Sequence, residues 1–162
     1  MKFKQKLTSS LLLLLTSVTA YGQYTYDEAC NILRKNGFTV YEGKYNHLQQ
    51  GYSFDYTRTF QPGFLYGIVA YTGSEYVKDI GLLVWSDKDK LLFQDSKKSN
   101  YETAHIYVDE IEDVRIEIRN QSATYPDRKF YCGFVIGYKD MDTLNSNTLR
   151  SDGDYSSEIR NR

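Results

Sequence analysis

Four aspartates near one predicted pair of strands are the first residues whose types and spacing suit a chemical role. They are Asp79, Asp87, Asp89 and Asp95. Calcium takes roughly six to eight oxygen ligands, and carboxylates supply them. However, Lys88 and Lys90 lie between the acids, and the glycine and terminal glutamate of an EF-hand loop are absent. The pattern therefore favours a solvated turn and no cofactor, with a calcium site as the alternative.

A second acidic run lies between two predicted strands. It contains Asp109, Glu110, Glu112 and Asp113. Such a run is either a solvated connection or a surface that attracts a basic partner. We add Tyr76, which precedes another predicted strand, to this candidate contact surface, because tyrosine is a preferred contact residue at binding surfaces.

Nucleophilic catalysis needs a nucleophile, a base and an orienting group within reach of one another. The imidazole bases are His47, in a polar segment, and His105, within a predicted strand. The sequence contains neither a Gly-x-Ser-x-Gly elbow nor a His-Glu-x-x-His pair. These observations predict a protein that is not an enzyme. A carboxylate-based hydrolase is the alternative, because the geometry of a carboxylate pair is not visible in a sequence.

Cys30 and Cys132 are the two cysteines of the chain. In an oxidising compartment a lone pair of cysteines usually forms one disulfide. The sequence therefore predicts a Cys30–Cys132 bridge that closes a loop of about 100 residues. The alternative is two separate buried thiols. A metal site is not expected, because two cysteines and two distant histidines lack the spacing of metal ligands.

Residues 1–22 predict the compartment in which the protein acts. Three lysines precede a leucine run at residues 11–15, and the small residues Ala20 and Gly22 follow. A charged segment, a short apolar segment and a small-residue cleavage site are typical of a secretory signal peptide. The apolar run is far shorter than the roughly 20 residues that span a bilayer. We therefore expect cleavage after this segment and a secreted or periplasmic protein.

The chain that remains after cleavage forms one domain by its length. We expect a β-domain at residues 23–139, and a polar, disordered tail at residues 140–162, which are rich in Asn, Ser, Asp and Arg. The whole chain has a net charge of −1, and loss of the three signal-peptide lysines makes it about −4. There is no basic stripe and no second long apolar stretch, so we expect neither a nucleic-acid partner nor a membrane span.

Residues 25–36 carry the one clear helical pattern. Thr25 and Glu28 have the spacing of a capping box at its start. Three apolar residues then fall on one helical face, at Ala29, Ile32 and Leu33. A helix this short needs a sheet against which to bury its apolar face.

Beyond residue 37 the hydrophobic period changes to two, which is typical of half-buried antiparallel strands. Eight segments are predicted as strands, at residues 38–41, 52–60, 64–71, 80–85, 91–93, 104–108, 114–119 and 130–138. Residues 61–63, Gln61-Pro62-Gly63, are predicted as a turn and residues 120–128 as a loop. The fold class is therefore mainly β, an antiparallel β-sandwich or jelly roll of about eight strands with one N-terminal α-helix.

A family resemblance extends over residues 50–138. It rests on Phe60-Gln61-Pro62-Gly63, on Tyr66-Gly67-Ile68-Val69-Ala70, and on residues 77–84 followed by a turn and Asp95. These segments resemble the bacterial pre-peptidase C-terminal domains, and the strands at 114–119 and 130–138 are similar to that family's closing hairpin. The resemblance implies a secreted jelly-roll sandwich that serves as a non-catalytic accessory or binding module and in some members binds calcium.

The chain also departs from that family. Asp79 fits the first acidic position of the family, but Gly81 stands where a second Asp is common. The N-terminal helix and the lack of an attached protease are further differences.

Tyrosine is unusually frequent, with 16 residues in the chain. Tyrosine either packs half-buried strand surfaces or forms a recognition face, and the sequence leaves both interpretations open. We predict a non-enzymatic binding module outside the cytoplasm that recognises a protein or a glycan. The alternative is an inhibitor or immunity-type protein that neutralises a specific secreted enzyme.

Overall fold

A computed structural model describes residues 24–141, which form one α-helix followed by eight β-strands. The helix α1 spans Tyr26–Lys35. The strands are β1 (Thr39–Leu48), β2 (Ser53–Phe60), β3 (Phe64–Tyr71), β4 (Val77–Trp85), β5 (Leu91–Gln94), β6 (Tyr101–Tyr107), β7 (Glu112–Ala123) and β8 (Phe130–Asp140). All eight predicted strands are present, and the mainly β fold class is confirmed. The predicted signal peptide and the predicted tail beyond residue 141 lie outside the described residues.

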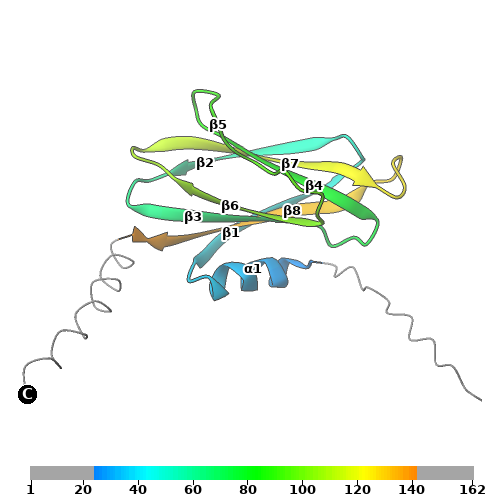
Figure 1. The fold of residues 1–162 in the computed structure, drawn as a ribbon, viewed down its shortest axis with the longest axis horizontal. Coiled ribbons are helices and arrows are strands. Elements are labelled where there is room, and N and C mark those ends of the chain that lie inside the picture. Colours follow the sequence, from blue (N-terminus) through cyan, green and yellow to red (C-terminus); the bar gives the residue numbers. More distant parts are fainter. Residues whose placement is uncertain (1–23, 142–162) are drawn as a thin grey trace, which may run out of the picture.

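The strands form two antiparallel sheets of four strands each. The helix-side sheet has the order β1-β8-β3-β6, and the solvent-side sheet has the order β2-β7-β4-β5. The strands pair as β1 with β8, β2 with β7, β3 with β6 and β4 with β5, like one long hairpin rolled up. This order is that of an eight-stranded jelly roll. Figure 1 shows the two layers, with α1 below the layer that contains β1, β8 and β3.

The main core lies between the two sheets and is built from alternate residues of each strand. On β7 the fully buried positions include Val114, Ile116 and Ile118. The alternation seen in the sequence is thus confirmed.

Strand β7 also continues to Ala123, into the segment predicted as a loop. There it pairs with the first residues of β4, and the side-chain amide of the buried Asn120 donates to the carbonyl of Leu48 at 3.1 Å.

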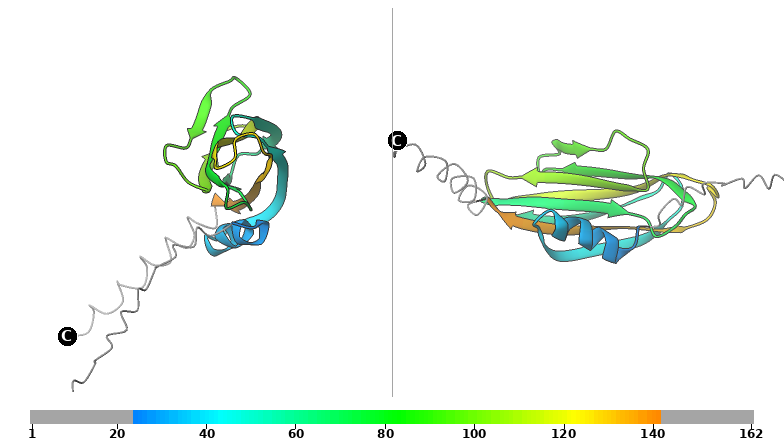
Figure 2. Two further views of the ribbon diagram at one scale, coloured as in Figure 1. Left: turned by 90° about the vertical axis from the view of Figure 1, so that its right-hand side faces the viewer. Right: turned by 60° about the horizontal axis from the view of Figure 1, so that its bottom comes forward.

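Helix α1 covers the outer face of the helix-side sheet, as Figure 2 shows. It begins with the predicted capping box. The Thr25 hydroxyl accepts a hydrogen bond from the N–H of Glu28 at 3.2 Å, and the Glu28 carboxylate accepts one from the N–H of Thr25 at 2.6 Å. Leu33 packs against β3 at Gly67, where a Cβ atom would lie 2.8 Å from Leu33 Cδ2. Glycine at this position therefore permits the close approach of helix and sheet.

The central strands of the helix-side sheet are consequently buried on both faces. On β3 and β8, Ile68 and Ile136 belong to the core between the sheets. Their neighbours in the chain, Val69 and Val135, point to the opposite face of the sheet and pack in the cluster beneath α1. Nearly continuous apolar runs are what strands covered on both faces require. Among residues 24–141 no helix is long and apolar enough to cross a membrane.

The predicted Cys30–Cys132 disulfide is wrong, because both cysteines are free and buried. Cys30 lies on α1, in the cluster on the outer face of the helix-side sheet. Cys132 lies on β8 and packs in the core between the sheets. The sheet lies between the two thiols, so the structure has the alternative arrangement of two separate buried thiols. Burial raises the pKa of Cys132 to about 12, so the reactive thiolate is scarce at neutral pH.

Both cysteines should react with an alkylating reagent when the protein is unfolded in denaturant without a reductant. In the native protein Cys132 should stay unlabelled, since it is buried and its thiol keeps its proton. Mass spectrometry of the alkylated chain counts the labels. A chain purified from an oxidising compartment that takes a label only after reduction would contradict the structure, because that is the behaviour of a disulfide.

Candidate functional site

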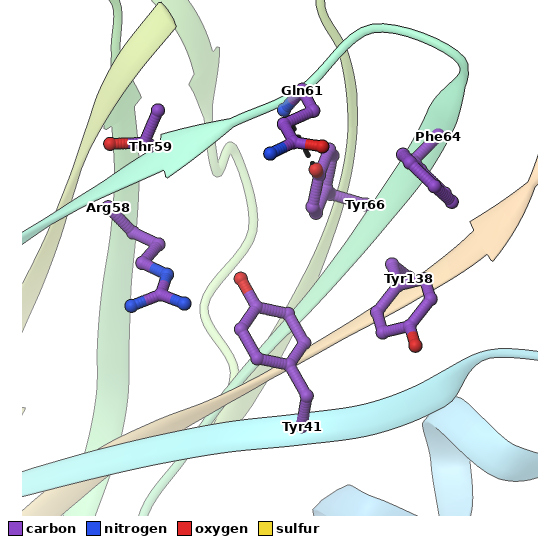
Figure 3. Close-up of a pocket in the computed structure, with 7 residues that line it drawn as sticks. All are labelled: Tyr41, Arg58, Thr59, Gln61, Phe64, Tyr66 and Tyr138. Carbon is purple, nitrogen blue, oxygen red and sulfur yellow. Dashed lines mark hydrogen bonds between the residues drawn. The ribbon is translucent and has the colours of Figure 1, made fainter. Parts of the chain in front are cut away.

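One pocket lies at the end of the sandwich where β1 and β3 begin and where β2 and β8 end. We call it the end pocket, and its volume is about 310 Å³. Its lining comes from these four strands and from the β2–β3 turn: Tyr41, Arg58, Thr59, Gln61, Phe64, Tyr66 and Tyr138. Figure 3 shows these side chains around a common space. Three tyrosines and one phenylalanine make the lining mostly aromatic.

A β-bulge positions Tyr41 in the end pocket. The register of β1 on β8 shifts between Val40 and Glu42, which leaves Tyr41 as the extra residue. A bulge of this kind re-aims a side chain and is common beside functional sites. The ring of Tyr41 makes an edge-on contact with that of Tyr138, with ring centres 5.7 Å apart. The bulge thus sets one aromatic wall of the pocket.

The turn predicted at residues 61–63 forms another wall and carries the chain from the solvent-side sheet to the helix-side sheet. Gly63 has a φ of 86°, in the left-handed region that favours glycine. The backbone N–H of Gln61 donates to the hydroxyl of Tyr66 at 2.8 Å. The Tyr66 ring in turn stacks on Phe60, with ring centres 3.8 Å apart. These contacts hold Gln61 at the rim of the pocket (Figure 3).

Arg58 carries the only charge among the seven lining residues. Its Nε atom lies 3.8 Å from Oε2 of Glu42, and its guanidinium carbon lies 5.6 Å from the ring centre of Tyr41. The other carboxylate oxygen of Glu42 accepts a hydrogen bond from Tyr56 at 2.6 Å and lies 3.3 Å from Nζ of Lys44. The guanidinium is therefore held between a carboxylate and a ring, and it points toward the Tyr41 hydroxyl (Figure 3).

The charges of Arg58, Glu42 and Lys44 stabilise one another. Burial disfavours the ionised carboxylate of Glu42, but hydrogen bonds from Tyr56 and Lys44 and the charge of Arg58 outweigh it and lower its pKa. The charge of Glu42 in turn raises the pKa of Arg58. Burial raises the pKa of Tyr41 to about 12, and the guanidinium of Arg58 opposes this effect. At neutral pH the pocket therefore presents a guanidinium beside a neutral Tyr41 hydroxyl.

The four aspartates considered for calcium do not converge on one point. Asp79 is buried and accepts a hydrogen bond from the N–H of Ser99 at 3.2 Å, and Asp95 accepts one from a backbone N–H of β4 at 3.1 Å. Asp87 and Asp89 are exposed in the turn between β4 and β5. In the described part of the chain no group of three or more His, Cys, Asp or Glu residues is arranged to hold a metal ion. Calcium binding by this set stays a prediction.

One carboxyl group that the sequence pattern missed lies near two of these acids. Burial raises the pKa of Glu102 on β6, and the charges of Asp95 and Asp79 raise it further. Burial also raises the pKa of Asp95, and the charge of Asp79 adds to the effect. The charges of these three carboxyl groups therefore act on one another in the fold. The carboxylate-based hydrolase alternative stays a prediction.

The predicted contact residues lie at opposite ends of the sandwich. The acidic run begins in the β6–β7 connection and continues into β7 beside the end pocket, where the Thr59 hydroxyl donates to Asp113 at 2.6 Å. Tyr76 precedes β4 at the other end, and the centre of its ring lies 5.2 Å from the centre of the Tyr125 ring. They therefore do not form the single contact surface that the sequence grouped together.

The two histidines lie on β1 and β6, the edge strands of the helix-side sheet, and neither lines the end pocket. The ring of His105 stacks on Phe38 at 5.4 Å. His47 contacts Tyr45 and Tyr131, at 6.2 and 5.9 Å between ring centres. Tyr45 is 61% exposed, so this aromatic group is one of several places where tyrosine reaches solvent. Both histidines thus take part in ring packing.

Comparison with known proteins assigns no family to the chain. No protein-family model matches it, and no curated protein matches it. The resemblance to the pre-peptidase C-terminal domains therefore stays a prediction. Function has to be inferred from the geometry of the end pocket.

The raised pKa of Tyr41 predicts a loss of stability at alkaline pH. In the unfolded chain Tyr41 ionises near pH 10, and in the folded chain near 12. The stability that its neutral hydroxyl contributes is thus present below pH 10 and is lost as the pH rises toward about 12. The free energy of unfolding of the native protein should fall over this range by about 1 kcal/mol more than that of Tyr41→Phe, after allowance for solvent screening at an open pocket.

Urea unfolding at a series of pH values measures this difference. The matched control is Tyr52→Phe, because Tyr52 is 63% exposed and lies directly before β2. Its pH profile should follow that of the native protein. Parallel profiles for the native protein and Tyr41→Phe would show that Tyr41 is not buried in the way described.

Proposed function

We propose that the protein is a secreted or periplasmic, non-enzymatic binding module that recognises a protein or a glycan through tyrosine-bearing strands and loops. The observation that carries this proposal is the end pocket, an aromatic concavity with a few polar groups aimed into it. Mostly apolar pockets with a small number of placed polar groups are typical of binding sites. The lysine-rich and leucine-rich start of the chain supports the compartment.

The rings of the end pocket are held in place by packing, which supports a binding role. Tyr138 contacts the rings of Tyr41 and Phe64, at 5.7 and 5.5 Å between centres, both edge-on. A ligand that binds to rings already fixed avoids much of the entropy cost of ordering them. The pocket therefore suits recognition by a largely preformed surface.

The chemistry of the lining residues favours binding over catalysis. None of the seven is a histidine, cysteine or carboxylate, the groups that most often act as general bases. The Thr59 hydroxyl, an aliphatic hydroxyl of the lining, donates to Asp113 at 2.6 Å. That arrangement lacks the imidazole and the orienting group of an activated nucleophile.

Capture experiments with three forms of the protein test this proposal. The native protein, Arg58→Gln and Arg115→Gln are immobilised and exposed to a glycan array and to the native cell envelope and medium, with bound proteins identified by mass spectrometry. Arg115 is the matched control, because its guanidinium also lies over a ring, that of Trp85 at 5.4 Å, and near a carboxylate, that of Asp89 at 3.4 Å.

We expect one ligand to be retained by the native protein and by Arg115→Gln. Its binding to Arg58→Gln should be weaker by about tenfold or more, the size of one lost charge-assisted hydrogen bond. Equal capture by all three forms, or no specific capture by any, would contradict a binding role for the end pocket. A dominant protein would identify the ligand as a protein, and a glycan hit as a carbohydrate.

A further inference from the structure

We infer that the end pocket binds one neutral pyranose ring of a glycan. This inference rests on the binding role proposed above and narrows it to one ligand class.

Aromatic and polar side chains occupy different sides of the end pocket. Figure 3 shows Phe64 and Tyr138 on one side and Arg58 on the other, with Tyr41 between them and Gln61 beside the Tyr66 ring. The Thr59 hydroxyl points away from these side chains and donates to Asp113. A pyranose ring has the matching division, because its C–H bonds form apolar faces and its hydroxyls lie around the edge. An aromatic ring packs against such a face through dispersion and hydrophobic contact.

The polar groups suit hydroxyls that both donate and accept hydrogen bonds. The guanidinium of Arg58 offers only donors in a planar fork, whereas the carboxamide of Gln61 offers donors and an acceptor. The Tyr41 hydroxyl beside Arg58 can do either, since its raised pKa keeps it protonated at neutral pH. Neighbouring sugar hydroxyls can therefore be bound in pairs along this side of the pocket.

The charges around the pocket disfavour an anionic ligand. Arg58 is already opposed by Glu42 at 3.8 Å, so it is not an uncompensated positive charge. Glu112 and Asp113 at the start of β7 pair with the end of β2 near the rim, where Asp113 accepts a hydrogen bond from Thr59, and they add negative charge next to the site. A sugar carboxylate or sulfate would meet repulsion from this side. A neutral sugar meets no such repulsion and needs no positive charge to balance it.

The size of the pocket fits one ring. Its volume of about 310 Å³ is at the lower end of the range of small-molecule sites, roughly 300–1,000 Å³. A single ring fills such a space, and the open mouth leaves room for the next unit of a glycan to extend into solvent.

A two-dimensional NMR titration of the uniformly ¹⁵N-labelled protein tests the inference. The probes are the methyl glycosides of glucose, galactose and mannose, with glucuronic acid as the anionic counterpart of glucose. The protein forms are the native chain, Arg58→Gln, Tyr41→Phe and the control Arg115→Gln. The dispersion of each free spectrum shows whether the variant is folded, and Tyr41→Phe keeps the ring while it removes only the hydroxyl.

At least one neutral glycoside should shift the amide signals of residues 58–66 in the native protein and in Arg115→Gln. Its dissociation constant should rise about tenfold or more in Arg58→Gln and also rise in Tyr41→Phe, through the loss of hydrogen bonds. Glucuronic acid should bind more weakly than methyl glucoside. Binding should depend little on salt, because a neutral ligand displaces no counter-ions.

Three results would overturn the inference: no shifts with any neutral glycoside, tighter binding of glucuronic acid, or affinities unchanged in a folded Arg58→Gln protein. If these occur while the capture experiment yields a ligand that depends on Arg58, the binding role stands and only the sugar assignment fails. If capture also shows no dependence on Arg58, both fail.

Discussion

The burial of the helix-side sheet on both faces is the constraint on which the rest of the structure depends. Ile68 and Ile136 face the second sheet while Val69 and Val135 face α1, so neither face of this sheet is left free at its centre. The close approach of helix and strands depends on residues without a side chain, Gly67 on β3, Gly137 on β8 and Gly43 on β1. The end pocket, formed by four strand termini and one turn, lies at one end of the sandwich, away from this covered centre.

Much of the fold follows from local sequence, because its signals are local. The capping box of Thr25 and Glu28, and the alternation through Val114, Ile116 and Ile118, act within a few residues and are found as predicted. The continuation of β7 was missed because a buried Asn120 breaks the apolar pattern, and its side-chain amide finds a hydrogen-bond acceptor only in the fold, at the distant carbonyl of Leu48. The disulfide failed for a related reason, since no local pattern tells which face of a sheet a helix will cover.

The candidate site was less predictable than the fold. The turn before Gly63 was visible in the sequence, but the bulge that aims Tyr41 depends on the pairing of β1 with β8. The pairing of Arg58 with Glu42 likewise joins two strands of different sheets. Charged residues that point inward at a sheet edge also hinder edge-to-edge association. Arg58 and Glu42 can therefore protect the edge and shape the pocket at once.

Native-state hydrogen exchange measures directly whether one sheet is buried between a second sheet and α1. We expect the amides of α1 and those of β3 and β8 to open with similar free energies, within about 1 kcal/mol, because the helix cannot leave without exposing Leu33, Val69 and Val135. Rapid exchange throughout α1, with the strands still protected, would contradict it. That result would mean that the helix is not an integral part of the core.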